Sequence, residues 1–477
     1  MNYIIRFFLI ILLFIPSILF SSCDSYLNIL PKGRKIPTTL SDYEAFIRNE
    51  YNHLNDCTQA INLLNDIYKT PSSLSYISLT SINYNWLENE DRIEQNNSDE
   101  ATYYYSYGAI SNWNFIIDNV LNVKGSTDDK KLELIAQSKV LRAMNYFYLT
   151  NYYAEQYDKN TSADKLSVPL ITSAEMGATS KQISIEDMYK FILKDLNDAV
   201  GNLPEESITI LHPNLGTCYA MLARVYLQIG DYENALKYAD NALSQNKQLF
   251  DWTEYYKENK LQIEKENDWS TSYPAVILSS PENYIFRYGS MAYKNYGQSG
   301  TSAALTFERA AKFEKGDARF ASKWKKKYQS PDSLYYGIRG DKFNAGGIST
   351  PEMYYIKAEC LARKGDASSI NAAMDVLNAV RITRIFADFY KPLVATTVKE
   401  AIEYIRRDKA NEYVQTAIPF WDARRFNKEL EYQKTLTKEY DGKIIELSPD
   451  SHLWVMPFPM GATSNPGNGT LEQNTPR

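Results

Sequence analysis

Cysteine and histidine are the side chains best suited to metal binding, and this sequence contains only four cysteines and three histidines. His53 and Cys57 are four residues apart, so a helix would place them on one face, where both could bind one metal ion. The remaining cysteines, apart from Cys23, are far apart at Cys218 and Cys360, and the other histidines are His212 and His452. Because no second pair stands near the first, we predict no metal site.

Acidic residues could support hydrolysis, because a glycosidase needs two carboxyl groups, one as acid and the other as base or nucleophile. The sequence has 58 Asp and Glu residues, so such a pair can always be imagined. No motif selects one, and we therefore assign no catalytic residue. A secreted glycosidase is only a distant alternative.

Cys23 has surroundings that indicate a covalent modification. Residues 7–20 form an apolar stretch after a short segment with one positive charge, and two serines place small residues directly before the cysteine. This is the profile of a signal peptide over residues 1–22 that ends in a bacterial lipobox, although Phe20 stands where leucine is usual. We expect cleavage before Cys23 and lipidation of its thiol. The alternative is an ordinary secretory signal beside an incidental cysteine.

The apolar stretch is too short to span a bilayer, which needs about 20 residues. The mature protein is therefore expected to be soluble apart from its lipid anchor. Its formal net charge of −6 at pH 7 gives no basic field that would attract nucleic acid or anionic lipid. We predict no nucleic-acid partner.

Hydrophobic residues recur at helical spacing over most of the chain, most clearly in residues 132–153 and 185–203. Ser184 precedes the second of these segments and Asp187 follows three residues later, as in a capping box. Both segments are predicted to be helices that bury one apolar stripe.

Residues 220–243 resemble a tetratricopeptide helix pair with its turn at Gly230. Small residues stand where the second helix of such a pair approaches the first: Ala235, Ala239 and Ala242. A weaker copy follows in residues 353–378, with its turn at Gly365. Two copies at irregular separation predict a mainly α fold, an α-superhelical scaffold with insertions.

Aromatic residues are unusually abundant, with 38 Tyr, 19 Phe and 7 Trp. Tyrosine and tryptophan combine an apolar face with a polar edge, which suits both wet binding surfaces and helix interfaces. From about residue 250 to 350 the helical periodicity disappears, and isolated aromatics stand among Gly, Ser, Pro and Asn. We interpret this segment as a loop-rich ligand face on a rigid scaffold. Packing of the loops onto the scaffold explains any single ring equally well.

The candidate ligand contacts are side chains with polar neighbours. Trp86, in the polar stretch 83–92, is the first candidate, and it could equally anchor its own loop. Trp269 has the same ambiguity. The remaining candidates are Tyr284, Arg287, Tyr288, Tyr296 and Trp324.

Short segments in a fixed order resemble the SusD/RagB family of outer-membrane nutrient-uptake lipoproteins. Those in the first half are 23–33 (CDSYLNILPKG), 142–149 (RAMNYFYL), 168–170 (VPL) and 192–199 (ILKDLNDA). Those in the second half are 352–359 (EMYYIKAE), 377–381 (LNAVR) and 452–459 (HLWVMPFP), then Asn465-Pro466 and Gln473-Asn474. Each is weak alone, but their order over nearly the whole mature chain is specific.

One segment departs from the family pattern. The family usually shows Glu-Arg, then Glu-Gly and an arginine before an aromatic-Asp-x-x-Arg run. The corresponding residues here are Asp408-Lys409, Thr416-Ala417 and Pro419 before Trp421. Charge is kept at the first pair and lost at the third position. We interpret this segment as scaffold, so the departure affects local packing more than function.

The resemblance implies one domain over residues 23–477, in which four tetratricopeptide-like helix pairs support the ligand face. It also implies a cell-surface, outer-membrane lipoprotein that captures glycans for a SusC-like TonB-dependent transporter, without catalytic residues or a cofactor. A peptide ligand on the same fold is the alternative, and charged pocket residues would favour it. A generic repeat adaptor would explain the helix pairs but neither the signal peptide nor the aromatic loops.

Overall fold

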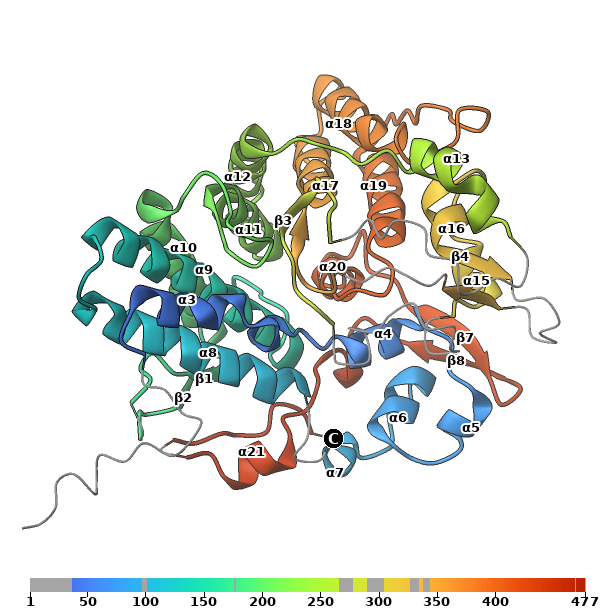
Figure 1. The fold of residues 1–477 in the computed structure, drawn as a ribbon. Coiled ribbons are helices and arrows are strands. Elements are labelled where there is room, and N and C mark those ends of the chain that lie inside the picture. The colour runs from blue at the N-terminus through green and yellow to red at the C-terminus, as the bar shows by residue number, and fades with distance from the viewer. Residues whose placement is uncertain are drawn as a thin grey trace, which may run out of the picture.

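The computed structural model describes residues 37–96, 101–175, 177–265, 278–289, 304–326, 334–337, 344–467 and 469–476. Within these residues the chain is mainly helical, as the periodicity predicts, and its strands form two-stranded sheets (Figure 1). The signal peptide, Cys23, Trp269 and Tyr296 lie outside the described residues.

Short helices make up the N-terminal part, which is blue in Figure 1. They are α3 (Leu40–Arg48), the 3₁₀ helix η1 (Glu50–His53), α4 (Thr58–Leu64), α5 (Pro71–Leu74), α6 (Leu79–Asn85) and α7 (Arg92–Gln95). Thr39 begins α3 with a capping box that Asp42 completes. Helix α6 ends at Trp86, whose backbone is left-handed with φ 51°.

Longer helices pack side by side in chain order and form a curved row from the left to the top of Figure 1. They are α8 (Ala101–Asn119), α9 (Asp128–Tyr153), α10 (Ile185–Ala199), α11 (Leu215–Gln228), α12 (Tyr232–Gln245), α17 (Thr350–Ala362), α18 (Ala367–Arg381) and α19 (Val398–Glu412). Helix α9 packs against both α8 and α10, α12 against both α11 and α17, and α17 also against α18 and α19. This is the predicted α-superhelical scaffold.

Helices α11 and α12 form the helix pair predicted from residues 220–243. Gly230 in their turn has φ +80°, which glycine adopts without strain. The three predicted contact alanines of α12 are fully buried. The second predicted pair is α17 and α18, and its turn contains Gly365 with φ +85°.

Helix α9 lies at the centre of the core, and every residue from Val140 to Tyr153 is buried. Arg142 forms a bidentate ion pair with Asp195 of α10, with both distances 2.8 Å, and it donates to Asn114 of α8 at 2.7 Å. A buried charge needs such partners, so this guanidinium fixes the relative positions of the three helices. Strands β1 (Leu166–Leu170) and β2 (Lys181–Ser184) pair antiparallel between α9 and α10 in the chain.

The described parts of residues 250–350 contain more regular structure than the sequence predicts. Their helices and strands are α13 (Trp252–Ile263), β3 (Asn283–Ile285), α15 (Phe307–Ala310), α16 (Ala318–Lys323), β4 (Trp324–Lys326), β5 (Tyr335–Gly337) and β6 (Ile348–Ser349). Strand β3 pairs antiparallel with β6, and β4 with β5. Apart from α13, these elements are short, so periodicity does not reveal them.

The C-terminal part returns to the N-terminal helices. Its elements are α20 (Ile418–Phe426), the hairpin of β7 (Leu436–Tyr440) and β8 (Lys443–Leu447), the 3₁₀ helix η5 (His452–Trp454) and α21 (Met460–Ser464). Arg92 of α7 donates to the carbonyl oxygens of His452 and Val455, both at 2.9 Å. Asn96 donates to the carbonyl oxygen of Pro457 at 2.7 Å. The two ends of the described chain are therefore held together.

Residues 408–425, which depart from the family pattern, lie within the scaffold. Arg425 forms a buried bidentate ion pair with Glu359 of α17, at 2.6 and 2.8 Å. Lys409 of α19 pairs with Asp422 of α20 at 2.8 Å. The charged residues of this segment thus form ion pairs between helices, which agrees with its interpretation as scaffold.

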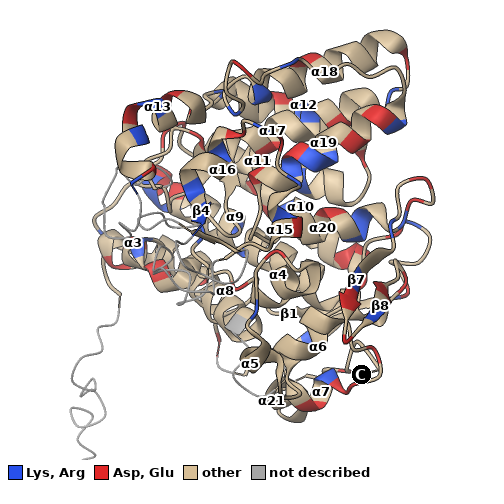
Figure 2. Cartoon of the chain, turned by 90° about the vertical axis from the view of Figure 1, so that its right-hand side faces the viewer, with Lys and Arg blue, Asp and Glu red and all other residues tan. Residues whose placement is uncertain are grey.

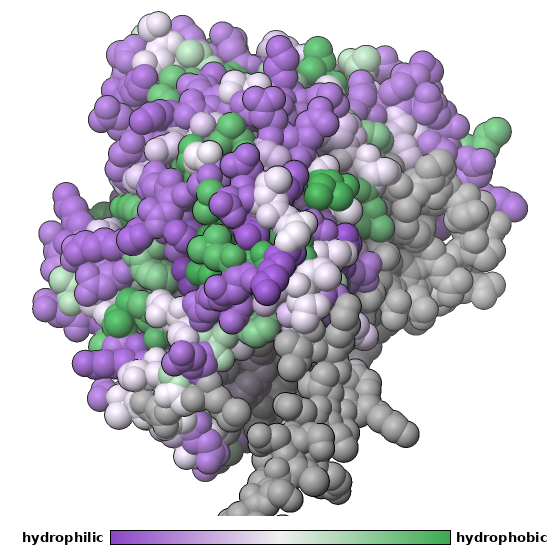
Figure 3. Space-filling model, turned by 60° about the vertical axis from the view of Figure 1, so that its left-hand side comes forward, coloured by the Kyte–Doolittle hydropathy of each residue, from purple (hydrophilic) through white to green (hydrophobic). Residues whose placement is uncertain are grey.

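Charges of both signs are intermixed on the surface. In Figure 2, basic and acidic residues alternate along α19 and its neighbours. On the face shown in Figure 3, hydrophobic residues form small patches separated by hydrophilic ones. Among the described residues, no helix is long and apolar enough to cross a membrane.

Candidate ligand-binding site

Trp86, the first candidate from the sequence, is 7% exposed. Its indole Nε1–H donates to the carbonyl oxygen of Leu63 in α4 at 2.8 Å. Lys438 of β7 places its Nζ 4.5 Å from the centre of the ring. The ring therefore joins the turn after α6 to α4 and to the C-terminal hairpin, in agreement with the anchor interpretation of this residue.

Tyr284 and Tyr288 are also buried, at 4% exposure each. The hydroxyl of Tyr284 contacts the carbonyl oxygens of Ala242 and Asn246 at 2.7 and 2.6 Å. The hydroxyl of Tyr288 donates to Glu50 of η1 at 3.0 Å. Both rings pack the segment around β3 onto the scaffold.

Arg287 and Trp324 have structural surroundings as well. Arg287 is fully buried and donates to the carbonyl oxygen of Asn52 and to Asn145 Oδ1, both at 3.0 Å. Trp324 is 3% exposed, and its ring centre lies 5.7 Å from that of Phe313. The structure does not bring the described candidates together at one exposed surface.

Exposed tyrosines that the sequence analysis did not single out are Tyr51, Tyr76, Tyr104, Tyr105 and Tyr440, with exposed fractions of 57, 63, 39, 38 and 37%. Two of them belong to residues 103–107 at the start of α8, where four of five residues are tyrosine. A helix buries only one face, so this run indicates exposed rings. The density of tyrosines in residues 103–107 is therefore the sequence signal that could have identified Tyr104 and Tyr105 as exposed.

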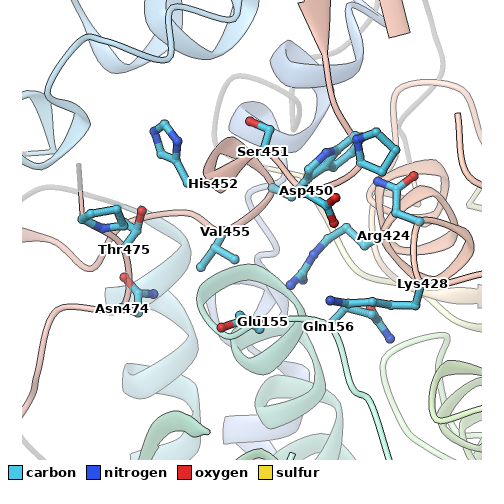
Figure 4. A pocket seen from close by; sticks show the side chains of 14 residues that line it. Glu155, Gln156, Arg424, Lys428, Asp450, Ser451, His452, Val455, Asn474 and Thr475 are labelled. Atoms are coloured by element: carbon cyan, nitrogen blue, oxygen red, sulfur yellow. The ribbon is translucent and has the colours of Figure 1, made fainter. Parts of the chain in front are cut away.

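A pocket of about 310 Å³ lies where the C-terminal segment meets α9 and α20 (Figure 4). Its volume is near the lower end of the range for small-molecule sites, about 300 Å³. Its lining includes His452, Trp454, Val455 and residues 474–476, which come from or adjoin the C-terminal motifs that carry the family resemblance. We call it the signature pocket.

Two side chains of the signature pocket are fixed by backbone carbonyl groups. Arg424 donates to the carbonyl oxygens of Asn151 and Ala154 at the end of α9. Asn474 donates to the carbonyl oxygen of Met456 at 2.9 Å. Burial lowers the pKa of Arg424 to about 10, so the guanidinium remains charged at neutral pH. These contacts give the pocket a rigid wall.

Other polar groups of this pocket remain available to a ligand. Asn427 Nδ2 is buried and has no acceptor among the described residues. Lys428 and Asp450 are exposed and line the pocket, and Figure 4 shows both side chains near Arg424. A ligand hydroxyl both donates and accepts, so this combination of donors and acceptors suits a polyhydroxylated molecule.

None of the described carboxyl groups whose pKa is raised by burial lines this pocket. These carboxyl groups are Asp56, Glu282 and Asp408. Within the described residues, no cluster of three or more His, Cys, Asp or Glu could hold a metal ion. His53 is buried against the carbonyl oxygen of Ile47 at 2.6 Å, and burial lowers its pKa well below the usual value.

Residues 25–227 match a family of SusD-like proteins described as starch-binding and associating with the outer membrane. A comparison with curated proteins gives no match. Solved structures with the same fold include a SusD superfamily protein from Bacteroides thetaiotaomicron, with 18% identity and a TM-score of 0.67 over 92% of this chain and 100% of that one. One from Bacteroides vulgatus has 16% identity and a TM-score of 0.70 over the same shares.

A third similar structure is the surface glycan-binding protein A from Bacteroides thetaiotaomicron in complex with laminarihexaose. It is 16% identical, with a TM-score of 0.62 over 92% of this chain and 100% of that chain. The chain thus has the mainly helical fold of the SusD superfamily. Together, the sequence match and the shared fold confirm its resemblance to the SusD/RagB family.

Proposed function

We propose that this protein is a cell-surface lipoprotein that captures oligo- or polysaccharides. The observation that carries the proposal is the combination of the starch-binding family match at residues 25–227 with the fold of a protein solved with laminarihexaose. The role is binding rather than catalysis. Planar rings stack on sugar faces, and polar side chains bond the hydroxyl groups.

The signature pocket is the proposed contact site among the described residues. Asn427, Lys428 and Asp450 offer hydrogen bonds to hydroxyl groups beside the fixed wall formed by Arg424. Trp269 and Tyr296 remain predictions as stacking residues. Because the described candidates from the sequence are buried, their proposed role is to hold the scaffold around the ligand face.

Attachment and transport complete the proposal. Lipid on Cys23 holds the protein at the outer membrane, and a SusC-like TonB-dependent transporter receives the glycan. The family description supports association with the outer membrane. Co-purification of the lipidated protein with a SusC-like channel from detergent-solubilised outer membranes tests the partnership.

A peptide ligand is the second candidate because the signature pocket carries charges of both signs. Glu155 and Asp450 are acidic, while Arg424 and Lys428 are basic. Charged groups of this kind would pair with the ends and side chains of a peptide. A direct comparison of neutral oligosaccharides with short peptides distinguishes the two ligand classes.

Calorimetric titration of a pocket variant tests the site. Asp450→Ala removes an acceptor for sugar hydroxyls, so the affinity for a bound oligosaccharide should fall by about 1 kcal/mol, or roughly fivefold. Glu446→Ala is the matched control, because Glu446 is exposed on nearby β8 and does not line the pocket. Equal affinities of both variants and the wild-type protein would place the glycan elsewhere.

A further inference from the structure

A second, smaller pocket of about 70 Å³ lies in the part of the chain predicted to form the ligand face. It is bounded by the start of α13, the end of α16, strands β3 and β6, and the turn after α19. Its lining shares no residue with that of the signature pocket. Polar side chains that line it include Ser280, Asn283, Asn344, Ser349 and Tyr413.

Trp252 lines this pocket and is 4% exposed. Its ring is held edge-to-face by Phe250 and Tyr255, with centre-to-centre distances of 5.1 and 5.6 Å. Lys323 places its Nζ 4.5 Å from the ring centre. The indole Nε1–H has no acceptor among the described residues, although a buried indole usually has one. A residue that lines the pocket therefore carries a rigid donor without an acceptor among the described residues.

Neutral hydrogen-bonding groups form another part of the lining. The hydroxyl oxygens of Ser349 and Tyr413 are 2.8 Å apart. Asn344 donates to Asn283 Oδ1 at 3.2 Å. Each hydroxyl and amide oxygen accepts more than one hydrogen bond, so these groups retain capacity for a ligand.

The carboxylates that line the pocket are already balanced by positive charge. Glu282 and Glu412 both pair with Arg384, at 2.7 and 3.1 Å. Glu412 also pairs with Arg319 at 2.5 Å. A neutral, hydroxyl-bearing ligand fits such a lining better than a cation, because the carboxylates have their partners.

We propose that this pocket binds the hydroxyl-bearing end of a glycan chain, with the Trp252 indole N–H donating to a sugar hydroxyl. The inference rests on the proposed glycan-binding function. A volume of 70 Å³ compares with about 30 Å³ per water molecule in the liquid. Hydroxyl and hydroxymethyl groups therefore enter, and the rest of the glycan stays outside.

Indole N–H signals in nuclear magnetic resonance test the contact directly. The chain has seven tryptophans, and the signal missing from Trp252→Phe identifies Trp252. The titrant is the first of laminarihexaose, maltohexaose, xylohexaose and mannohexaose that the wild-type protein binds. Its addition should shift the Trp252 signal. The signal of Trp324 should remain in place, because this indole is equally buried and without an acceptor among the described residues, yet does not line the pocket.

Affinity provides the second measurement. Trp252→Phe keeps an aromatic ring but removes the donor, so binding should weaken about 3- to 10-fold, while Trp324→Phe should bind like the wild-type protein. If wild-type binding leaves the Trp252 signal unchanged, the donor does not contact the glycan and the inference is wrong. If the wild-type protein binds none of the four oligosaccharides, the proposed function itself fails.

Discussion

The ammonium nitrogen of Lys438 lies 4.5 Å from the centre of the Trp86 ring. The same nitrogen donates to Asn65 Oδ1 at 2.8 Å and to the carbonyl oxygen of Tyr84. One basic side chain from the C-terminal hairpin thus covers a face of the ring that the sequence offered as a candidate platform for sugar. Trp86 is consequently part of the contact between the two ends of the chain.

Trp86→Ala should therefore destabilise the protein without weakening glycan binding. Removing a buried tryptophan side chain typically costs about 3–5 kcal/mol, measured here as the free energy of unfolding in urea. Tyr76→Ala is the control, because Tyr76 is 63% exposed and its loss should change stability by less than about 0.5 kcal/mol. Unchanged stability with lost affinity would instead show that the Trp86 ring contacts ligand.

Lys438 should make stability depend on pH. Burial lowers the pKa of its ammonium group from the ordinary lysine value of about 10.4 to about 7. Between these values the unfolded chain binds more protons at this side chain than the folded protein, so its contribution to stability rises with pH. The unfolding free energy of the wild-type protein minus that of Lys438→Met should therefore increase from about pH 6.5 to about pH 9.

The control for this pH effect is Lys434→Met, because Lys434 is exposed in the same segment. Its difference from the wild-type protein should stay constant over the same pH range. A constant difference for Lys438→Met as well would show that Lys438 remains charged in the folded protein.

The close approach of α12 to α11 gives a third prediction. Ala235 is fully buried, and Ala235→Leu should overpack the contact and lower stability by about 1–3 kcal/mol. Lys237→Leu adds a leucine at an exposed position of the same helix and should leave the melting temperature nearly unchanged. Equal melting temperatures for both variants would contradict the observed helix pair.

The sequence predicts the scaffold well because its signals are local. The spacing of apolar residues in 132–153, the turn at Gly230 and the alanines of 220–243 each report a contact made within one helix or between neighbouring helices. The alanines of residues 220–243 are buried in α11 and α12 as predicted. Helix α9 differs from the prediction, because it buries every residue from Val140 to Tyr153 and not one stripe alone.

The site is harder to predict because its signals are not local. The polar stretch 83–92 suggests an exposed ring, yet Asn83 and Arg92 are buried. Arg92 donates to the carbonyl oxygen of His452, 360 residues away, and no local pattern reveals such a partner. The signature pocket likewise combines residues from the ends of α9 and α20 and from the C-terminal segment. The sequence therefore revealed the C-terminal motif but not the pocket that it helps to form.

Cys23→Ala should release the protein from membranes, because the predicted lipid is its only proposed covalent anchor. Fractionation of cells that lack the partner transporter measures this effect without retention by the channel. The wild-type protein should remain with the outer membrane, while the variant should appear in the soluble fraction. Equal membrane retention of both proteins would contradict the lipid anchor.

Calorimetric titration of the wild-type protein with neutral oligosaccharides, beginning with laminarihexaose, tests the central claim of glycan binding most directly. Hydrogen bonds and ring stacking on an uncharged ligand are little affected by screening, so binding should be saturable and the affinity should change less than about twofold between low and high salt. Short charged peptides should bind more weakly under the same conditions. Saturable, strongly salt-dependent binding of peptides, with none of any oligosaccharide, would contradict the claim.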